Sequence, residues 1–216
     1  MNQPTPLRID FVSDVVCPWC AVGLASLERA LDALKDEVRA EIHFQPFELN
    51  PQMPREGEDI GEHIAKKYGL SPAQLAQNQE AIRQRGAAVG FTFAHQDTRR
   101  IYNTFDAHRL LHWAGEHGGQ HALKRALLVA YFTEGRDIGD HAVLAEVAGA
   151  AGLDATEAAA VLASDRYAED VRGDEQFFLR AGIHSVPAII IDQQHLISGG
   201  QPPEVFERAL RQLAAR

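Results

Sequence analysis

The residues with the clearest chemical potential are two cysteines in the stretch SDVVCPWCAVG, near the start of the chain. Cys17 and Cys20 are the only cysteines among 216 residues, and they lie three positions apart. Such a pair could be a redox dithiol, half of a metal site, a structural crosslink or a coincidence. Two cysteines placed at random would adopt this spacing only on the order of once in a hundred sequences, so coincidence is the weakest of these explanations.

The neighbouring sequence predicts that the cysteine pair lies at the start of a helix. Residues 7–12, LRIDFV, have the alternation and composition of a strand. After the pair, apolar residues recur at steps of three and four, at Leu24, Leu27, Leu31, Leu34 and Val38. Pro18 suits the first helical turn, where its missing N–H loses no bond. Cys17 is therefore expected at the helix N-terminus, with Cys20 one turn inside.

A cysteine in this position is suited to nucleophilic chemistry. The unpaired N–H groups at a helix start carry about half a positive charge, which favours a thiolate over a thiol. Cys17 would attack a disulfide, and Cys20 would resolve the mixed disulfide by closing the intramolecular bond. The flanking sequence predicts that Cys20 is packed and that Cys17 is the more exposed. Asp14 would either disfavour the thiolate by like-charge repulsion or shape the turn.

The metal alternative needs more ligands than the cysteine pair supplies, because a structural zinc site usually has four. The chain has ten histidines. His108 and His112 lie four apart on one predicted helix, and His117 and His121 have the same spacing across a glycine break. Neither histidine pair forms a recognised site, and the dipeptide between the cysteines suits a redox turn better than a zinc knuckle. We therefore predict no metal site.

Composition narrows the cellular setting. The net charge is −9 and the pI is near 5.5, which argues against binding to nucleic acid or to an anionic membrane. The N-terminal MNQPTPLRIDF lacks the basic segment and apolar run of a secretory signal. No apolar stretch approaches the ~20 residues of a membrane span. We expect a cytoplasmic protein, and reducing conditions there disfavour a permanent structural disulfide.

The order of predicted elements indicates an α/β fold that is interrupted by helices. The first part reads β-α-β, with a second strand over residues 40–49 and a parallel crossover. Residues 60–164 read as one helix after another. They are followed by a helix over 166–181, short strands over 185–192 and 195–198, and a last amphipathic helix. We predict one discontinuous domain of residues 1–59 and 165–216, and a helical insertion domain of residues 60–164.

Three segments carry a family resemblance: IDFVSDVVCPWCAVG, YNTFDAHRLLHWA and GIHSVPAIIID…ISGGQPPEVFERAL. They resemble the thioredoxin superfamily, and more closely its DsbA-like, FrnE-type thiol–disulfide oxidoreductases. The resemblance covers nearly the whole chain. It implies a thioredoxin-like fold with a large all-helical insertion between an N-terminal βαβ part and a C-terminal αββα part.

The resemblance also implies roles for particular residues. Pro187 falls on the cis-proline of the superfamily, and Val186 would then offer its backbone to an extended substrate segment. In another interpretation Pro187 simply begins a strand in the trans form. Pro18 and Trp19 would add to the substrate-binding surface, with the Trp19 ring exposed to apolar substrate. Ser185 departs from the glycine or threonine of many relatives, which puts the detail of substrate binding in doubt.

By the same resemblance, the helix that contains residues 103–116 packs over the catalytic face. Its polar residues Asn103, Asp106 and His108 could contact substrate or tune the cysteines. The interpretation we favour is that they lie on a helix whose other, apolar side carries Phe105, Leu110 and Trp113.

Together these features predict a thiol–disulfide oxidoreductase that acts on thiol or disulfide substrates, either proteins or small molecules. It needs no cofactor, because the electrons reside in the dithiol. One alternative is an enzyme that uses glutathione as a co-substrate, like the kappa-class glutathione transferases and 2-hydroxychromene-2-carboxylate isomerases on the same scaffold. Those relatives typically carry serine where this chain has Cys17, which favours redox chemistry here. The other alternative is a non-enzymatic holdase or adaptor with silent cysteines.

Overall fold

The computed structural model describes residues 4–94 and 100–215 and is built on a four-stranded sheet of order β2-β1-β5-β6. Strands β1 (Thr5–Ser13) and β2 (Val38–Pro46) are parallel and are connected by helix α1 (Pro18–Ala33). Strand β5 (Ala188–Ile191) runs antiparallel to β1, and β6 (His195–Ser198) runs antiparallel to β5. The sheet therefore joins the two ends of the chain, and the α/β class predicted from the sequence is confirmed.

Several element boundaries differ from the sequence prediction, three of them with a clear physical cause. Helix α1 ends at Ala33, so Val38 does not belong to its apolar face but begins β2, where it pairs with Thr5. Strand β2 ends at Pro46, because proline has no N–H with which to continue a ladder. Strand β5 begins only at residue 188, because the three residues before it form a loop against α1.

Between β2 and β5 the chain is mainly helical. Its helices are α2 (Ile60–Tyr68), α3 (Pro72–Val89), α4 (Phe105–Glu116), α5 (Gln120–Phe132), α6 (His141–Ala150), α7 (Ala155–Leu162) and α8 (Ala168–Arg180). Two short strands that the sequence did not predict, β3 (Glu58–Asp59) and β4 (Arg100–Ile101), pair antiparallel. Helix starts follow local capping: Ser71 and Gln74 form a capping box, and Asp140 and Asp154 accept backbone N–H groups of the first turn.

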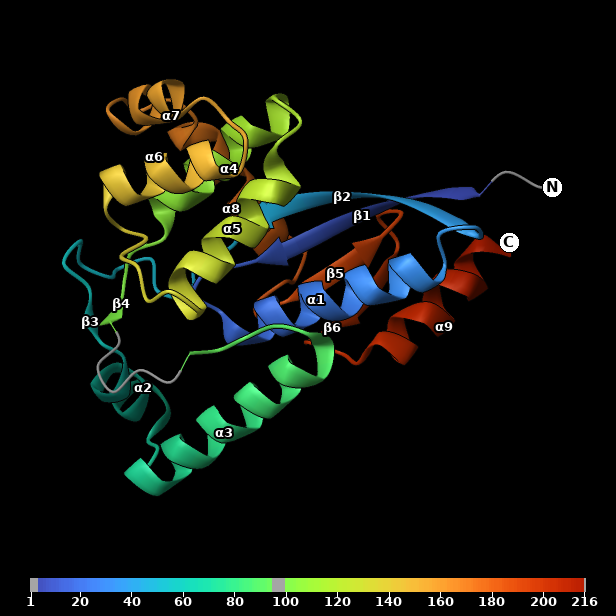
Figure 1. Cartoon of the computed structure of the whole chain (residues 1–216), viewed down its shortest axis with the longest axis horizontal. Coiled ribbons are helices and arrows are strands. Elements are labelled where there is room, and N and C mark those ends of the chain that lie inside the picture. The colour runs from blue at the N-terminus through green and yellow to red at the C-terminus, as the bar shows by residue number, and fades with distance from the viewer. Residues whose placement is uncertain (1–3, 95–99, 216) are drawn as a thin grey trace.

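Figure 1 shows how these elements are arranged around the sheet. Helices α4 to α7 gather at one end of the molecule, whereas α1 and the C-terminal helix α9 (Pro203–Ala214) lie side by side. Helix α3 packs against α1 from outside. One continuous buried cluster includes Ile9 and Phe11 of the sheet as well as Leu127 and Phe132 of α5. The sheet and the helical segment, which is the part of the chain between β2 and β5, therefore share a core. Side chains of α5 can thus reach elements of the sheet.

Candidate active site

The two thiols lie at the N-terminal end of α1. Cys17 is the N-cap residue, with an extended backbone, and Pro18 occupies the first turn as predicted. The N–H of Cys20 donates to the carbonyl of Cys17 over 3.0 Å, which places Cys20 one turn into the helix. Both residues are free thiols, Cys17 4% exposed and Cys20 fully buried. The predicted order of exposure holds, but Cys17 is much less open than the sequence suggested.

The loop before β5 faces this end of α1. The Val186–Pro187 peptide bond is cis, the form that the resemblance implied. The Sγ of Cys17 lies 3.8 Å from the carbonyl oxygen of Val186, within the range of a weak thiol hydrogen bond. The carbonyl of Pro187 accepts the N–H of Gly199 over 2.8 Å, which ties this loop to the end of β6. Residues far apart in the sequence are thus held around one sulfur.

Trp19 marks the open side of the site. The residue is 38% exposed, in line with the prediction, and Pro18 beside it is half-buried. The guanidinium of Arg85 on α3 lies 6.0 Å from the centre of the Trp19 ring and donates to the carbonyl of Gly200 over 3.0 Å. An aromatic surface and a cation therefore border the thiol pair, next to the cis-proline loop.

Two glycines allow α1 and the surrounding loops to approach so closely. A Cβ at Gly200 would lie 2.8 Å from the carbonyl oxygen of Trp19, a separation that real Cβ atoms almost never show. A Cβ at Gly23 would lie 3.2 Å from Cγ of Pro187. The absence of side chains at these positions is what lets the helix carrying the cysteines contact the loops.

The substitution Gly200→Ala is therefore expected to destabilise the fold by about 1–3 kcal/mol, because backbone would have to move to accommodate one methyl group. Urea unfolding followed by circular dichroism measures this loss. The matched control is Gly173→Ala in α8, where a Cβ would have no neighbour within 4 Å. That change should stabilise the protein by about 0.5–1 kcal/mol, because alanine is the better helix former. Equal effects of the two substitutions would contradict the close approach at Gly200.

A charged cluster lies beneath the thiols. The carboxylate of Asp14 is fully buried, and its Oδ2 accepts the N–H of Leu49 over 2.8 Å. Its Oδ1 lies 3.4 Å from Nε2 of His108 on α4. Burial alone would raise the pKa of the Asp14 carboxyl, but His108, the Leu49 N–H and the nearby Lys124 hold that pKa below its ordinary value. Asp14 is therefore a buried carboxylate as well as part of the turn before Cys17.

The second member of the cluster, Lys124 on α5, was not singled out from the sequence. Its side chain is fully buried, and its Nζ has no hydrogen-bond partner among the residues that the structure describes. Burial lowers the pKa of Lys124, whereas Cys20, Asp14 and Cys17 oppose that effect. Burial and the neighbouring Cys17 raise the pKa of the Cys20 thiol well above its ordinary value, and Lys124 opposes this shift. The sequence signal that could have identified Lys124 is its place on the apolar side of the predicted helix, between Leu123 and Leu127.

Of the three polar residues considered on the helix over residues 103–116, one lies at the site. His108 is 2% exposed and faces Asp14, so the interpretation that it merely decorates the helix is wrong. Asn103 donates to the carbonyl of Met53 and accepts the N–H of Phe105, next to the start of α4. Asp106 accepts from Arg109 and pairs with His141. Asn103 and Asp106 therefore have their partners in the segment between β2 and β5, not at the thiol pair.

Neither a metal-ligand cluster nor a membrane-spanning helix occurs in residues 4–94 and 100–215. The histidines considered as ligands each have another neighbour. His112 lies 3.5 Å from Asp174, His117 contacts the carbonyl of Trp113 over 2.8 Å, and His121 pairs with Glu28.

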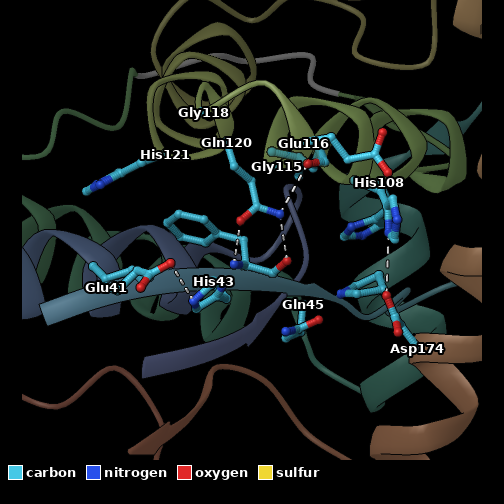
Figure 2. A pocket seen from close by; sticks show the side chains of 15 residues that line it. Glu41, His43, Gln45, His108, Gly115, Glu116, Gly118, Gln120, His121 and Asp174 are labelled. Carbon is cyan, nitrogen blue, oxygen red and sulfur yellow. Dashed lines mark hydrogen bonds and ion pairs between the residues drawn. The ribbon is translucent and has the colours of Figure 1, made fainter. Parts of the chain in front are cut away.

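A cavity of about 500 Å³ opens beside the outer edge of β2. Figure 2 shows Gln120 reaching from α5 to the backbone of this strand. Phe44 donates its N–H to the side-chain oxygen of Gln120 over 2.9 Å and accepts from the amide nitrogen over 3.1 Å. The side-chain amide thus acts as a short strand partner at an exposed sheet edge. His108 lines the same cavity and also lies beside Asp14, so the cavity adjoins the buried carboxylate.

The sheet, the thiol pair at a helix start and the facing cis-proline loop define the class of protein. The chain belongs to the DSBA-like thioredoxin domain family, whose model matches residues 8–211. The fold is accordingly thioredoxin-like with a helical insertion, as predicted from the sequence.

The chain is also similar to individual proteins and solved structures. The chain is 37% identical to a probable DsbA oxidoreductase from Streptomyces coelicolor, whose crystal structure superposes with a TM-score of 0.91 over 97% of this chain and 91% of that one. It is 28% identical to the uncharacterized protein YwbO of Bacillus subtilis, over 94% of this chain and 96% of the relative. The cytosolic disulfide reductase DsbM of Pseudomonas aeruginosa, solved with GSH, shares the fold at 16% identity, with a TM-score of 0.64 over 97% and 100% of the chains.

Proposed function

We propose that this protein is a thiol–disulfide oxidoreductase in which Cys17 attacks and Cys20 resolves. The Cys17 thiolate attacks a substrate disulfide, forms a mixed disulfide and releases one substrate sulfur as a thiolate. Cys20 then gives up its proton, to the released substrate thiolate or to solvent, and attacks Sγ of Cys17, which releases the second substrate sulfur. The substrate gains two electrons, and the protein is left with a Cys17–Cys20 disulfide. The same steps in reverse oxidise a substrate dithiol.

The observation that carries this proposal is the placement of Cys17. Its sulfur lies at the amide end of α1 and beside the Val186 carbonyl, with buried Cys20 one turn further on. Because a thiolate has no proton to donate, ionisation of Cys17 would leave that carbonyl able to accept from a substrate backbone. In this proposal Pro18, Trp19, Val186 and Pro187 contact the substrate, and the exposed Trp19 ring covers its apolar part.

The proposal also covers the cellular compartment and the small-molecule exchange partner. The thiol pair needs no bound cofactor, and glutathione is its small-molecule exchange partner, a choice supported by the related fold of a cytosolic disulfide reductase solved with GSH. A reducing cytoplasm fits a dithiol that is used in turnover rather than as a permanent crosslink. The FrnE-type subdivision is part of the same proposal.

Equilibration with glutathione redox buffers tests the proposal. The purified protein is brought to equilibrium at many ratios of reduced to oxidised glutathione, and its thiols are trapped by alkylation and counted by mass. We expect one transition in which both cysteines change together, as a two-electron couple. Thiol status that stays constant between strongly reducing and strongly oxidising buffers would contradict the proposal.

Two further outcomes identify the alternatives. Activity that requires stoichiometric glutathione and survives Cys20→Ser would favour a transferase or isomerase. Protection of an unfolding client protein that is unaffected by loss of both cysteines would favour a holdase or adaptor.

A further inference from the structure

The buried amine of Lys124 is the feature of this site that thiol exchange alone does not explain. A buried charged group without hydrogen bonds is costly unless opposite charge compensates it. The ammonium has no hydrogen-bond partner in the described part of the chain, and the ring of Phe44 on β2 lies 5.9 Å from it. Its opposite charge comes from Asp14, and from the two cysteines when they ionise. Lys124 therefore lies within electrostatic range of the groups whose charge changes in the reaction.

The charge inside this cluster depends on the redox state. With the Cys17–Cys20 disulfide formed, the Asp14 carboxylate and the Lys124 ammonium balance each other. In the reduced state, ionisation of the thiol pair adds one negative charge to the same apolar surroundings. His108, from α4, also faces Asp14. Buried Glu48 lies within electrostatic range of His108, but Arg172 pairs with its carboxylate. Lys124 is thus the cation of this cluster that acts electrostatically on the cysteines.

We propose that Lys124 is a positioning residue of the thiol pair, whose ammonium stabilises the reduced state while the Asp14 carboxylate opposes it. This inference rests on the proposed function, because it concerns the same Cys17–Cys20 couple. The two residues act with opposite sign on one equilibrium. The lysine belongs to α5 of the helical segment, so a side chain outside the sheet and α1 would set how oxidising the thiol pair is.

The reaction in question is reduction of the protein disulfide by glutathione. Two glutathione thiols become one glutathione disulfide, and their two electrons break the Cys17–Cys20 bond. When the reduced pair ionises, one of the two protons released remains on Cys20 and the other enters solvent, so the negative charge lies on Cys17. Only the product side can take up this added negative charge, because a disulfide has no ionisable proton. A nearby cation therefore shifts the equilibrium towards the dithiol, and a nearby anion shifts it back.

The test measures the equilibrium constant of this reaction in wild type and in two variants of the cluster. Lys124→Met keeps the length of the side chain and removes the charge, and it should lower the constant about tenfold, a fall of about 30 mV in reduction potential. Asp14→Asn retains an oxygen that can accept the Leu49 N–H, and it should raise the constant by a similar factor. The opposite signs are the essential expectation.

Two controls remove similar charges elsewhere. Arg125→Met removes a cation from the next position of α5, where the side chain is exposed and pairs with Glu28. Asp10→Asn removes a carboxylate that is also nearly buried, but which pairs with Arg8. Neither control should change the equilibrium constant by more than about twofold.

A second readout separates charge from packing. Because burial lowers the pKa of Lys124, wild type loses the ammonium as pH rises, and the difference between wild type and Lys124→Met should shrink with it. A purely structural role would give a difference that does not depend on pH. A pH-independent difference would overturn the inference.

The remaining outcomes are also decisive. If wild type equilibrates with glutathione but the two variants shift in the same direction, or not beyond the controls, this inference is wrong and the proposed function stands. If wild type shows no reversible couple, both are wrong. If Lys124→Met does not fold, the sign of Asp14→Asn decides: an increase supports the inference, and no increase overturns it.

Discussion

Replacing Cys17 by serine should reduce disulfide exchange by at least about a thousandfold, because a serine hydroxyl does not ionise near neutral pH and cannot form a mixed disulfide. The residue lies at the amide end of α1, so the effect is on the attacking atom rather than on the fold. The measurement is the rate at which the reduced protein consumes an aromatic disulfide, followed by absorbance. A hydroxyl in place of a nearly buried thiol should leave the unfolding midpoint close to that of wild type.

The companion variant Cys20→Ser should behave differently. Cys17 would still attack, but no second thiol would resolve the product, so a mixed disulfide with the substrate should accumulate and be visible by mass. The two serine variants therefore serve as controls for one another. Two results with Cys17→Ser would contradict the assignment of the attacking sulfur. One is an exchange rate close to that of wild type, and the other is a stable mixed disulfide between the substrate and Cys20.

Arg109→Met should destabilise the protein by about 3–5 kcal/mol, the typical cost of removing one partner from a buried ionic network. Arg109 on α4 is 4% exposed. Its guanidinium donates to the Asp106 carboxylate and to backbone carbonyls of Val161, Ser164 and Arg166. Methionine would fill much of the space but donate none of these hydrogen bonds. The free energy of unfolding, from urea denaturation, measures the loss.

The matched control for Arg109 is Arg125→Met on the neighbouring helix. Arg125 is exposed and has one ion pair, so its loss should change the free energy of unfolding by less than about 0.5 kcal/mol. Similar losses for the two arginine variants would show that the carbonyl network between α4 and the α7–α8 segment contributes little to stability.

Local patterns in the sequence predicted the parts of this protein that depend on near neighbours. The helix starts at Pro18, Pro72 and His141 follow from residues within one turn, because a cap satisfies N–H groups of its own helix. The thiol pair could be found for the same reason: its spacing and its position after a strand are local features. The two-residue strands β3 and β4 escaped prediction, because each forms only by pairing with a distant segment.

The sequence by itself determined that a closely spaced cysteine pair begins a helix after a strand, because the residues that decide this are adjacent in the chain. Only the tertiary structure decided the charge around that pair. It brings Asp14, His108 and Lys124 together from a loop and two helices, and it buries them. Burial and electrostatic energy depend on distance in space. The helical periodicity of the sequence indicates that a lysine is directed inward, but it does not indicate which anion lies near that lysine.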